Sequence, residues 1–444
     1  MDIIIKILQL ILSLSILVVV HEFGHFIAAK AFKTRVEKFY LFFNPWFSIF
    51  KFNYKGTEYG MGWLPLGGYV KISGMIDESM DKEQMKKPPE PWEFRSKPAW
   101  QRLIIMLGGV IMNVVLAIVI YIGILTYYGE EYLPTSEANK YGISADSLAT
   151  EMGFRNGDKV VSLDGVQIED FQKIPMNMIL NEAKTAQVIR NGKEVNVVFP
   201  EGSLKKLIKH KSPLFLSVRL PFIAQSFTKE SVAKEAGMEA GDTIIGIDGV
   251  EKRYFGEFRN EIEQHKNEDV TINVIRGLDT LNLEMHLGGD GLLGVFPKND
   301  LDEFFVLHKK TYNVIQAIPA GFNRTWTGIG NYLKQLKLLF SPEVKAYENV
   351  GGFGMIASIF PSTWHWQSFW KLTAFLSIML AIINILPIPA LDGGHVLFLL
   401  YEIIARRKPS DKFLEYAQVV GMIILFSLLL YANGMDVVRY FNPN

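Results

Sequence analysis

Four long runs of apolar residues divide the chain, at positions 7–20, 103–126, 372–391 and 416–435. A bilayer core needs about 20 consecutive apolar residues per helix, and the last three runs have that length. The first run has it when the polar residues 21–25 are counted within the same helix. A cleaved signal peptide is the alternative for the first run, but no small-residue cleavage site follows it. The pattern therefore predicts four membrane-spanning helices.

Basic residues gather in three short segments: after the first apolar run, before the second, and between the third and the fourth. They are Lys30, Lys33, Arg35, Lys38, Arg95, Lys97, Arg102, Arg406, Arg407 and Lys408. With four spans, all three segments lie on the same side of the membrane, and the positive-inside rule makes that side cytoplasmic. Both termini and the stretch from about 130 to 366 are then expected on the extracytoplasmic side.

Residues 146–165 and 230–249 repeat one pattern of glycine, aspartate and apolar positions. In chain order, Gly153, Gly157, Asp158, Asp164 and Gly165 of the first copy match Gly237, Gly241, Asp242, Asp248 and Gly249 of the second. The pattern predicts a helix, a turn that contains glycine, a short apolar strand and a tight Asp-Gly turn. Repetition of this kind indicates two tandem copies of one domain.

The repeated pattern resembles that of PDZ domains, small β-rich modules that can accept an extended peptide as an additional strand. The resemblance implies capture or screening of peptides outside the membrane. The alternative is a module that only positions the membrane part and binds nothing.

Composition limits the chemistry that the chain can perform. It carries 46 Lys and Arg against 46 Asp and Glu, and it has no cysteine. Nucleic-acid-binding proteins usually carry a basic excess, so no nucleic-acid partner is expected. A chain without cysteine forms no disulfide, iron–sulfur cluster or thiolate zinc site. Any metal must therefore be bound by histidine or carboxylate side chains.

The strongest chemical signal is the sequence His-Glu-Phe-Gly-His at positions 21–25. On a helix, residues four apart lie on one face, so the imidazoles of His21 and His25 can bind one metal ion. Glu22 can then act as general base toward a water whose pKa bound zinc lowers to about 7. Chance occurrence on a helix face is the alternative. Three ionisable side chains at the end of a membrane helix are costly, however, and therefore indicate function.

Catalytic zinc usually has three protein ligands, so two histidines leave one ligand missing. The third apolar run ends in a segment where Pro387 and Pro389 break or bend the helix. Irregular backbone at membrane depth is tolerated where it is buried in protein or lines a water-filled cavity. Asp392 in this segment is the candidate third ligand, and an ordinary Asp-Gly turn at a helix end is the alternative.

The HEFGH sequence, the NILPIPALDGG sequence and the PDZ-like repeats between them resemble the site-2 protease family of intramembrane zinc metalloproteases. The resemblance covers essentially the whole chain. It implies one Zn²⁺ per chain and cleavage of single-span membrane proteins within the bilayer, typically after another protease has trimmed the substrate. It also implies the cytoplasmic (inner) membrane of a bacterium, with the PDZ-like domains on the extracytoplasmic side.

Carried over position by position, the resemblance makes His21, His25 and Asp392 the zinc ligands and Glu22 the catalytic base. Asn384 matches an asparagine that contacts the substrate backbone in the family.

A second group of residues is assigned to substrate binding by the same resemblance. Gly67, Gly68, Tyr69 and Val70 match a segment that enters the membrane as β-structure and pairs with the unwound substrate. An ordinary cytoplasmic β-hairpin is the alternative for this region. Asn113 stands at the end of a motif that often begins with Gly-Pro, where this chain has valine instead of proline. Asn113 is either a polar contact to the site or part of a hydrogen bond between helices.

The predicted fold is a multi-pass α-helical membrane protein with four transmembrane helices and a re-entrant β-hairpin. Two tandem PDZ-like α+β domains are inserted between helices 2 and 3. The expected divisions are 1–32 (first transmembrane helix with HExxH), 33–102 (cytoplasmic or re-entrant β region), 103–128 (second transmembrane helix), 129–220 and 221–300 (the PDZ-like domains), 301–366 (amphipathic linker helices), 367–405 (third transmembrane segment) and 406–444 (fourth transmembrane helix and C-terminus). In the linker, residues 315–340 have the apolar spacing of a helix that lies on the outer membrane surface.

The predicted function is hydrolysis of peptide bonds within the transmembrane segments of single-span proteins, either anti-sigma-type regulators or remnant signal peptides. The PDZ-like domains would screen substrates that have already been trimmed. Two alternatives stay open from the sequence: a membrane-tethered zinc protease acting on extracytoplasmic proteins, and a non-catalytic scaffold that recruits peptides. The expected partners are the substrates and the lipid bilayer, and the sequence does not indicate an oligomeric state.

Overall fold

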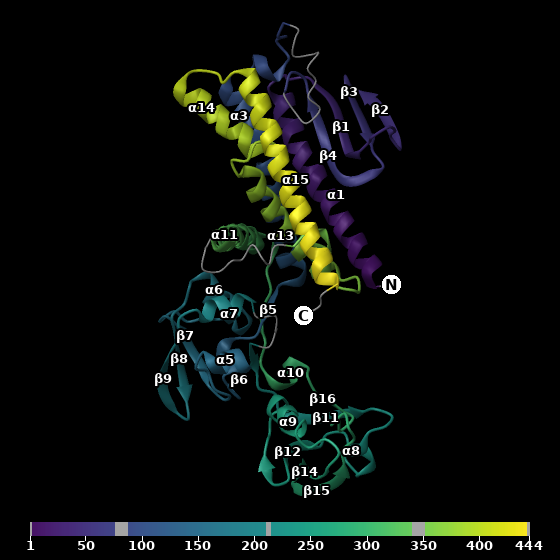
Figure 1. Ribbon diagram of the computed structural model, residues 1–444, viewed down its shortest axis with the longest axis vertical. Coiled ribbons are helices and arrows are strands. Elements are labelled where there is room, and N and C mark those ends of the chain that lie inside the picture. The colour runs from purple at the N-terminus through teal and green to yellow at the C-terminus, as the bar shows by residue number, and fades with distance from the viewer. Residues whose placement is uncertain (1, 76–87, 210–214, 340–350, 442–444) are drawn as a thin grey trace. The chain divides into compact units, whose positions relative to one another are not determined.

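The computed structural model describes residues 2–75, 88–209, 215–339 and 351–441 (Figure 1). These residues form two compact units. The first unit comprises Met1–Gly129 and Thr311–Asn444, and the second comprises Glu130–Lys310. The second unit is therefore an insertion in the chain of the first.

The first unit is mainly helical. Its described helices are α1 (Asp2–Ala31), η1 (Phe94–Ser96), α3 (Ala99–Tyr128), α11 (Val314–Leu339), α12 (Phe353–Ile359), α13 (Trp366–Ile385), α14 (Asp392–Ala405) and α15 (Asp411–Phe441). Within the described ranges, α1, α3, α13 and α15 are long and apolar enough to cross a membrane. The predicted multi-pass helical architecture is confirmed to this extent.

Helix α3 is the centre of the first unit, because α1, α11, α13 and α14 all pack against it. Small residues allow the closest approach: a Cβ on Gly24 of α1 would lie 2.2 Å from the carbonyl oxygen of Gly108 of α3. Helices in membranes commonly associate through such small residues, because they let two backbones touch. Gly24 lies between His21 and His25, so this contact fixes the two histidines against α3.

A four-stranded sheet follows α1 in the chain. Its strands are β1 (Val36–Phe43), β2 (Phe50–Tyr54), β3 (Thr57–Met61) and β4 (Leu64–Ile72), in the order β2-β3-β1-β4. The sequence predicted a β-hairpin here, and β2 and β3 do form one. The sheet is larger because β1 pairs in parallel with β3 and antiparallel with β4. Strand β4 is thus an edge strand, and it packs against α1.

The third apolar run contains a break. The sequence placed this run at 372–391, whereas α13 ends at Ile385 and α14 begins only at Asp392. The intervening segment contains two prolines, which cannot donate the backbone hydrogen bonds of a continuing helix. It also contains Ala390 with φ 81°, a left-handed conformation that no helix residue adopts. Asp392 therefore occupies the first turn of a new helix.

The second unit contains the two sequence repeats. Its described elements are β5 (Glu130–Tyr132), α4 (Thr135–Ala138), β6 (Ile143–Ala145), α5 (Ser147–Glu151), β7 (Lys159–Leu163), η2 (Phe171–Lys173), α6 (Ile174–Leu180), β8 (Thr185–Arg190), β9 (Lys193–Val198), α7 (Ser203–Lys209), β10 (Leu216–Val218), β11 (Phe222–Phe227), α8 (Val232–Glu235), β12 (Thr243–Ile247), β13 (Val250–Glu251), α9 (Phe255–Ile262), β14 (Asp269–Arg276), β15 (Asp279–His286), β16 (Val295–Pro297), α10 (Leu301–Phe304) and β17 (His308–Lys310). Each repeat has its own hydrophobic core.

The two repeats fold in the same way over the repeated sequence. Each has a short helix (α5 or α8), a glycine turn, an apolar strand (β7 or β12) and an Asp-Gly turn, as the pattern predicts. The aspartates of these turns have φ angles of 45° at Asp164 and 49° at Asp248. Aspartate tolerates this left-handed conformation better than most residues, which explains why it recurs there.

An ion pair with a buried aspartate also recurs in both repeats. Asp158 pairs with Arg190 in the first, and Asp242 pairs with Arg276 in the second, each with an N–O distance of 2.7 Å. In both cases the arginine also donates to a glycine carbonyl of the preceding turn. Sequence comparison of the repeats finds the aspartates but not the arginines, because the spacing between partners differs. The shared pair indicates that the repeats are copies of one fold.

Candidate metal centre

His21 and His25 lie one helical turn apart on α1, and both side chains are buried. Their Nε2 atoms are 3.3 Å apart, and the two rings meet edge to face with centroids 4.9 Å apart. The spacing of four residues predicted this common face. Asp392, more than 360 positions away, completes the group: its Oδ2 lies 3.2 Å from Nε2 of each histidine.

The three atoms fit a zinc ion by distance. Ligand atoms around a tetrahedral zinc lie about 3.3 Å apart, because each Zn–N or Zn–O bond is about 2.0 Å long. The three measured separations are 3.2, 3.2 and 3.3 Å. Among the residues that the structure describes, His21, His25 and Asp392 form the one group of three such side chains whose ligand atoms converge.

The protonation of the histidines supports the same fit. His25 Nδ1 lies 2.8 Å from the carbonyl oxygen of Ile105. A carbonyl only accepts, so Nδ1 carries the proton and donates it, and in the neutral imidazole Nε2 then has a lone pair. Asp392 Oδ2 is buried and accepts no hydrogen bond from any described residue. Converging lone pairs of this kind need a cation between them.

Helix α3 supports both imidazoles from behind. His21 Nδ1 lies 3.2 Å from the side-chain amide of Asn113, whose oxygen is buried without a described partner. Half a turn of that amide directs its oxygen at Nδ1, which gives both groups a partner. Between these contacts lies Gly109, where a Cβ would be 2.5 Å from His25 Nε2. Ile105, Gly109 and Asn113 are spaced four apart, so one stripe of α3 holds the two histidines.

The segment before Asp392 is held by contacts that leave almost no free space. A Cβ on Gly393 would lie 2.2 Å from the carbonyl oxygen of Leu386, so only glycine fits there. From α15, the Gln418 side chain accepts a hydrogen bond of 3.2 Å from the backbone N–H of Ala390. Gln418 is a buried polar residue within an apolar helix, and it fixes the left-handed turn that precedes Asp392.

A cavity of about 620 Å³ opens in front of these side chains. Glu22 lines it beside the two histidines, and its carboxylate is within hydrogen-bonding reach of the Val70 backbone on β4. Asn384, at the end of α13, also lines the cavity, and its side-chain nitrogen is 3.4 Å from His21 Nε2. The cavity therefore contains a carboxylate, an amide and a candidate metal centre.

The predicted substrate-binding segment of β4 forms another wall of this cavity, which Gly67, Gly68, Tyr69 and Val70 all line. Gly68 allows β4 to approach α1, because a Cβ there would lie 2.9 Å from Val18. Tyr69 is held in place by a 3.0 Å hydrogen bond to Asn44 and by stacking on Tyr40. The edge of β4 and the candidate metal centre thus share one cavity.

Two contributors were not found by sequence reasoning. The Ile105 carbonyl is a backbone group that every residue type has, so the sequence gives no sign of its role. Gln418 did have a signal, because a polar amide within an apolar run is costly in a membrane and usually has a partner. This signal was overlooked because the run at 416–435 carries no charge.

Comparison with known proteins gives a consistent result. The sequence model of "Peptidase family M50" matches residues 9–428. Proteins named "Putative zinc metalloprotease" from Vibrio cholerae and Campylobacter jejuni are 28% and 29% identical, over 99% and 98% of this chain and 99% and 94% of their own lengths. "Regulator of sigma-E protease RseP" of Escherichia coli is 28% identical over 97% of both chains.

Proposed function

We propose, because the chain belongs to peptidase family M50, the site-2 protease family of zinc metalloproteases, that it hydrolyses peptide bonds within the transmembrane segments of single-span membrane proteins. The observation that carries this proposal is the convergence of His21, His25 and Asp392 within 3.3 Å, between helices apolar enough to span a membrane. An active centre in that position reaches substrates inside the bilayer, unlike that of a tethered protease acting on outside proteins.

In the proposed reaction, His21, His25 and Asp392 bind the zinc ion of the family. When bound there, zinc polarises the attacking water and the scissile carbonyl as a Lewis acid. Glu22 accepts a proton from the water as it attacks and passes it to the departing amine nitrogen. Asn113 and the Ile105 carbonyl keep the imidazoles in the tautomer that presents Nε2 to the metal. Asn384 donates a hydrogen bond to a carbonyl oxygen of the substrate.

The substrate must be extended, because a helix hides its carbonyls in internal hydrogen bonds. The free edge of β4 offers backbone groups to an added strand, and Gly67, Gly68, Tyr69 and Val70 lie along the active-centre cavity. We therefore propose that the unwound substrate pairs with β4. Exposed aromatic residues at the far end of the sheet, including Trp46, Phe50 and Phe52, suit contact with lipid and support a re-entrant position.

The two repeats are proposed to be PDZ-like domains, at 129–220 and 221–300, that screen substrates already trimmed by another protease. Their shared fold, with an Asp-Gly turn and an Asp–Arg pair in each, supports this assignment. The positive-inside rule supports an extracytoplasmic position for them and a cytoplasmic position for the loops at 30–38, 95–102 and 406–408. The proposed location is the inner membrane of a bacterium, and the proposed substrates are anti-sigma-type regulators or remnant signal peptides.

Substitution of Glu22 tests the proposed chemistry. Glu22→Gln should abolish cleavage of a purified single-span reporter reconstituted with the full chain, because glutamine cannot accept the proton from water. Zinc content should stay at one ion per chain, since Glu22 is not a proposed ligand. Asp392→Ala should lose most of its zinc as measured by elemental analysis. Glu263→Gln, a change at an exposed carboxylate of the second unit, should alter neither quantity.

Three outcomes would contradict parts of this proposal. Wild-type cleavage by Glu22→Gln would remove the base assignment, and full zinc occupancy in Asp392→Ala would remove the third ligand. Preferential cleavage of a soluble extracytoplasmic protein over the membrane reporter would favour the tethered protease instead.

A further inference from the structure

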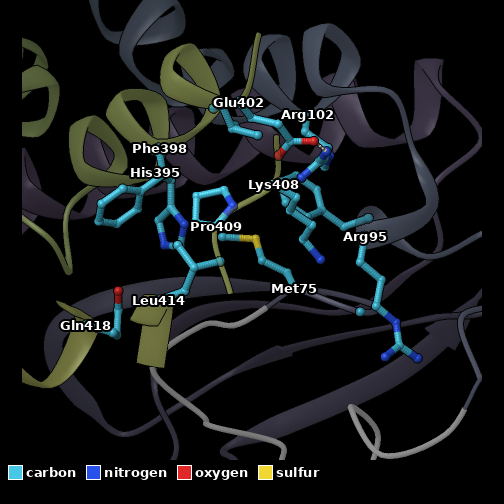
Figure 2. Close-up of a pocket in the computed structure, with 13 residues that line it drawn as sticks. Met75, Arg95, Arg102, His395, Phe398, Glu402, Lys408, Pro409, Leu414 and Gln418 are labelled. Atoms are coloured by element: carbon cyan, nitrogen blue, oxygen red, sulfur yellow. Dashed lines mark hydrogen bonds and ion pairs between the residues drawn. The ribbon is translucent and has the colours of Figure 1, made fainter. Parts of the chain in front are cut away.

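A second cavity adjoins the active-centre cavity. The two share Met75, His395 and Gln418 as lining residues, so they are direct neighbours. Figure 2 shows the second cavity, with Leu414 and Gln418 at the lower left, Met75 near the centre and the Arg102–Glu402 pair at the top. The proposed reaction uses none of the residues that line only this second cavity.

One wall of the second cavity is a single face of α14. Asp392, His395, Leu399 and Glu402 are three or four residues apart and therefore share that face. The face starts at the proposed zinc ligand and leads away from it. With a rise of about 1.5 Å per residue, Phe398 lies roughly 9 Å along the helix from Asp392.

Another part of the lining comes from the turn that follows β4. The strand passes the active-centre cavity at residues 67–72, and the chain then reaches Gly74 and Met75, which line the second cavity. A substrate strand paired with β4 would therefore leave the active-centre cavity beside the second cavity, where β4 ends. An extended strand advances about 3.3 Å per residue, so about 9 Å corresponds to roughly three residues.

The interior of the second cavity is apolar. Met75, Phe94, Phe398, Leu399 and Leu414 supply most of its surface. Its far end is closed by Arg102 and Glu402, whose side chains pair at 2.5 Å and leave no net charge there. Such a lining favours a large apolar side chain over a small one, because the large side chain removes more apolar surface from water.

We infer that this cavity is a specificity subsite, which takes a leucine- or phenylalanine-sized side chain about three residues from the scissile bond. Arg95 and Lys408 also line the second cavity, and both belong to the segments proposed to face the cytoplasm. A substrate strand that reaches the subsite therefore runs toward the cytoplasmic side. The residue recognised is therefore on the cytoplasmic side of the scissile bond. This inference rests on the proposed function, since a subsite requires a cleaved substrate.

The test is a panel of single-span reporters cleaved by the full-length chain in lipid. Each position up to five residues from the scissile bond on the cytoplasmic side is changed in turn to Ala or Phe. The unaltered chain should cleave the Phe reporter about tenfold faster than the Ala reporter at one position near the third. Other positions should discriminate less.

Leu414→Trp provides the decisive variant, because its ring would fill the subsite from α15. The Phe-to-Ala rate ratio at the selective position should fall about tenfold. The matched control is Val420→Trp, an exposed position on the same helix outside the cavity lining, which should keep the ratio of the unaltered chain. A benzophenone side chain at the selective position should also cross-link to α14 or α15 in the Glu22→Gln chain.

The possible outcomes distinguish a failure of the subsite inference from a failure of the proposed function. Cleavage by the unaltered chain with an unchanged ratio in Leu414→Trp would overturn the subsite, and so would an equal loss for all reporters. Cross-links confined to other elements would overturn it as well. Absence of any cleavage by the unaltered, zinc-loaded chain would instead overturn the proposed function.

Discussion

The imidazoles of His21 and His25 rest on the backbone of α3 at Gly109, and no side chain separates them from it. A Cβ there would lie 2.5 Å from His25 Nε2 and 2.6 Å from His21 Cε1, far inside contact distance. Gly109→Ala should therefore displace both proposed ligands and lower zinc affinity by roughly 10- to 100-fold, the range found when groups supporting a ligand are lost. Competition with a calibrated chelator measures this change.

Gly123→Ala is the matched control, because it lies on the same helix and its Cβ would meet open space. Alanine also has the higher helix propensity, so this variant should fold at least as well as the parent chain and keep its zinc. Equal zinc affinity in the two variants would contradict the view that Gly109 holds the imidazoles in place.

How well individual residues could be predicted depends on the range of the contact. His21, Glu22 and His25 lie within five positions of one helix, where spacing alone puts the histidines on one face. Asp392 could be tied to them only through its motif, because no local pattern reports a contact across the whole chain. The Ile105 carbonyl could not be predicted at all, since its role depends on where α1 crosses α3.

The secondary structure elements that the apolar pattern predicted correctly are the long ones, whose hydrogen bonds join residues close in sequence. The membrane helices are of this kind, but the β region is not: its hairpin was predicted and its four-stranded sheet was not. The missing pairs, β1 with β3 and β1 with β4, join strands across intervening loops. Strand partners of that kind are set by packing against α1 and not by the sequence of any one strand.

The Asp–Arg pair of the second repeat predicts how that element responds to acid. Arg276 donates two hydrogen bonds to Asp242 and so holds the pKa of that carboxyl below its usual range. A carboxyl with a lowered pKa stabilises the fold above its unfolded pKa of about 3.9, and this contribution is lost as the pH falls through the folded value. Asp242→Asn should therefore cost roughly 2 kcal/mol at pH 7 and progressively less below about pH 4.

Hydrogen exchange of β12 and β14 in the full chain measures this stability locally. Asp279→Asn, at an exposed position of the same repeat, should leave protection unchanged at every pH. A deficit in Asp242→Asn that stayed constant from pH 7 to pH 3 would show that the pair does not contribute through its charge.

The chain enters and leaves the second unit at one place. Strand β5 pairs antiparallel with β17, with Glu130 opposite Lys310, so the two ends of the unit are hydrogen-bonded neighbours. Paired residues in such a ladder have Cα atoms about 5 Å apart. Residues 130–310 can therefore be removed and Gly129 joined to Thr311 through a short flexible linker, with little strain on the first unit.

Removing residues 130–310 tests whether the second unit selects substrates and the first unit cleaves them. If the repeats screen substrates, the shortened chain should cleave both a trimmed single-span reporter and a reporter that keeps a large extracytoplasmic domain. The full chain should cleave the reporter with the large domain at least tenfold more slowly than the shortened chain does. Zinc content, measured alongside, shows that the active centre has survived. A zinc-loaded shortened chain that cleaved neither reporter would mean that the repeats help to bind every substrate. One that kept the full chain's preference for the trimmed reporter would place the selection within the first unit.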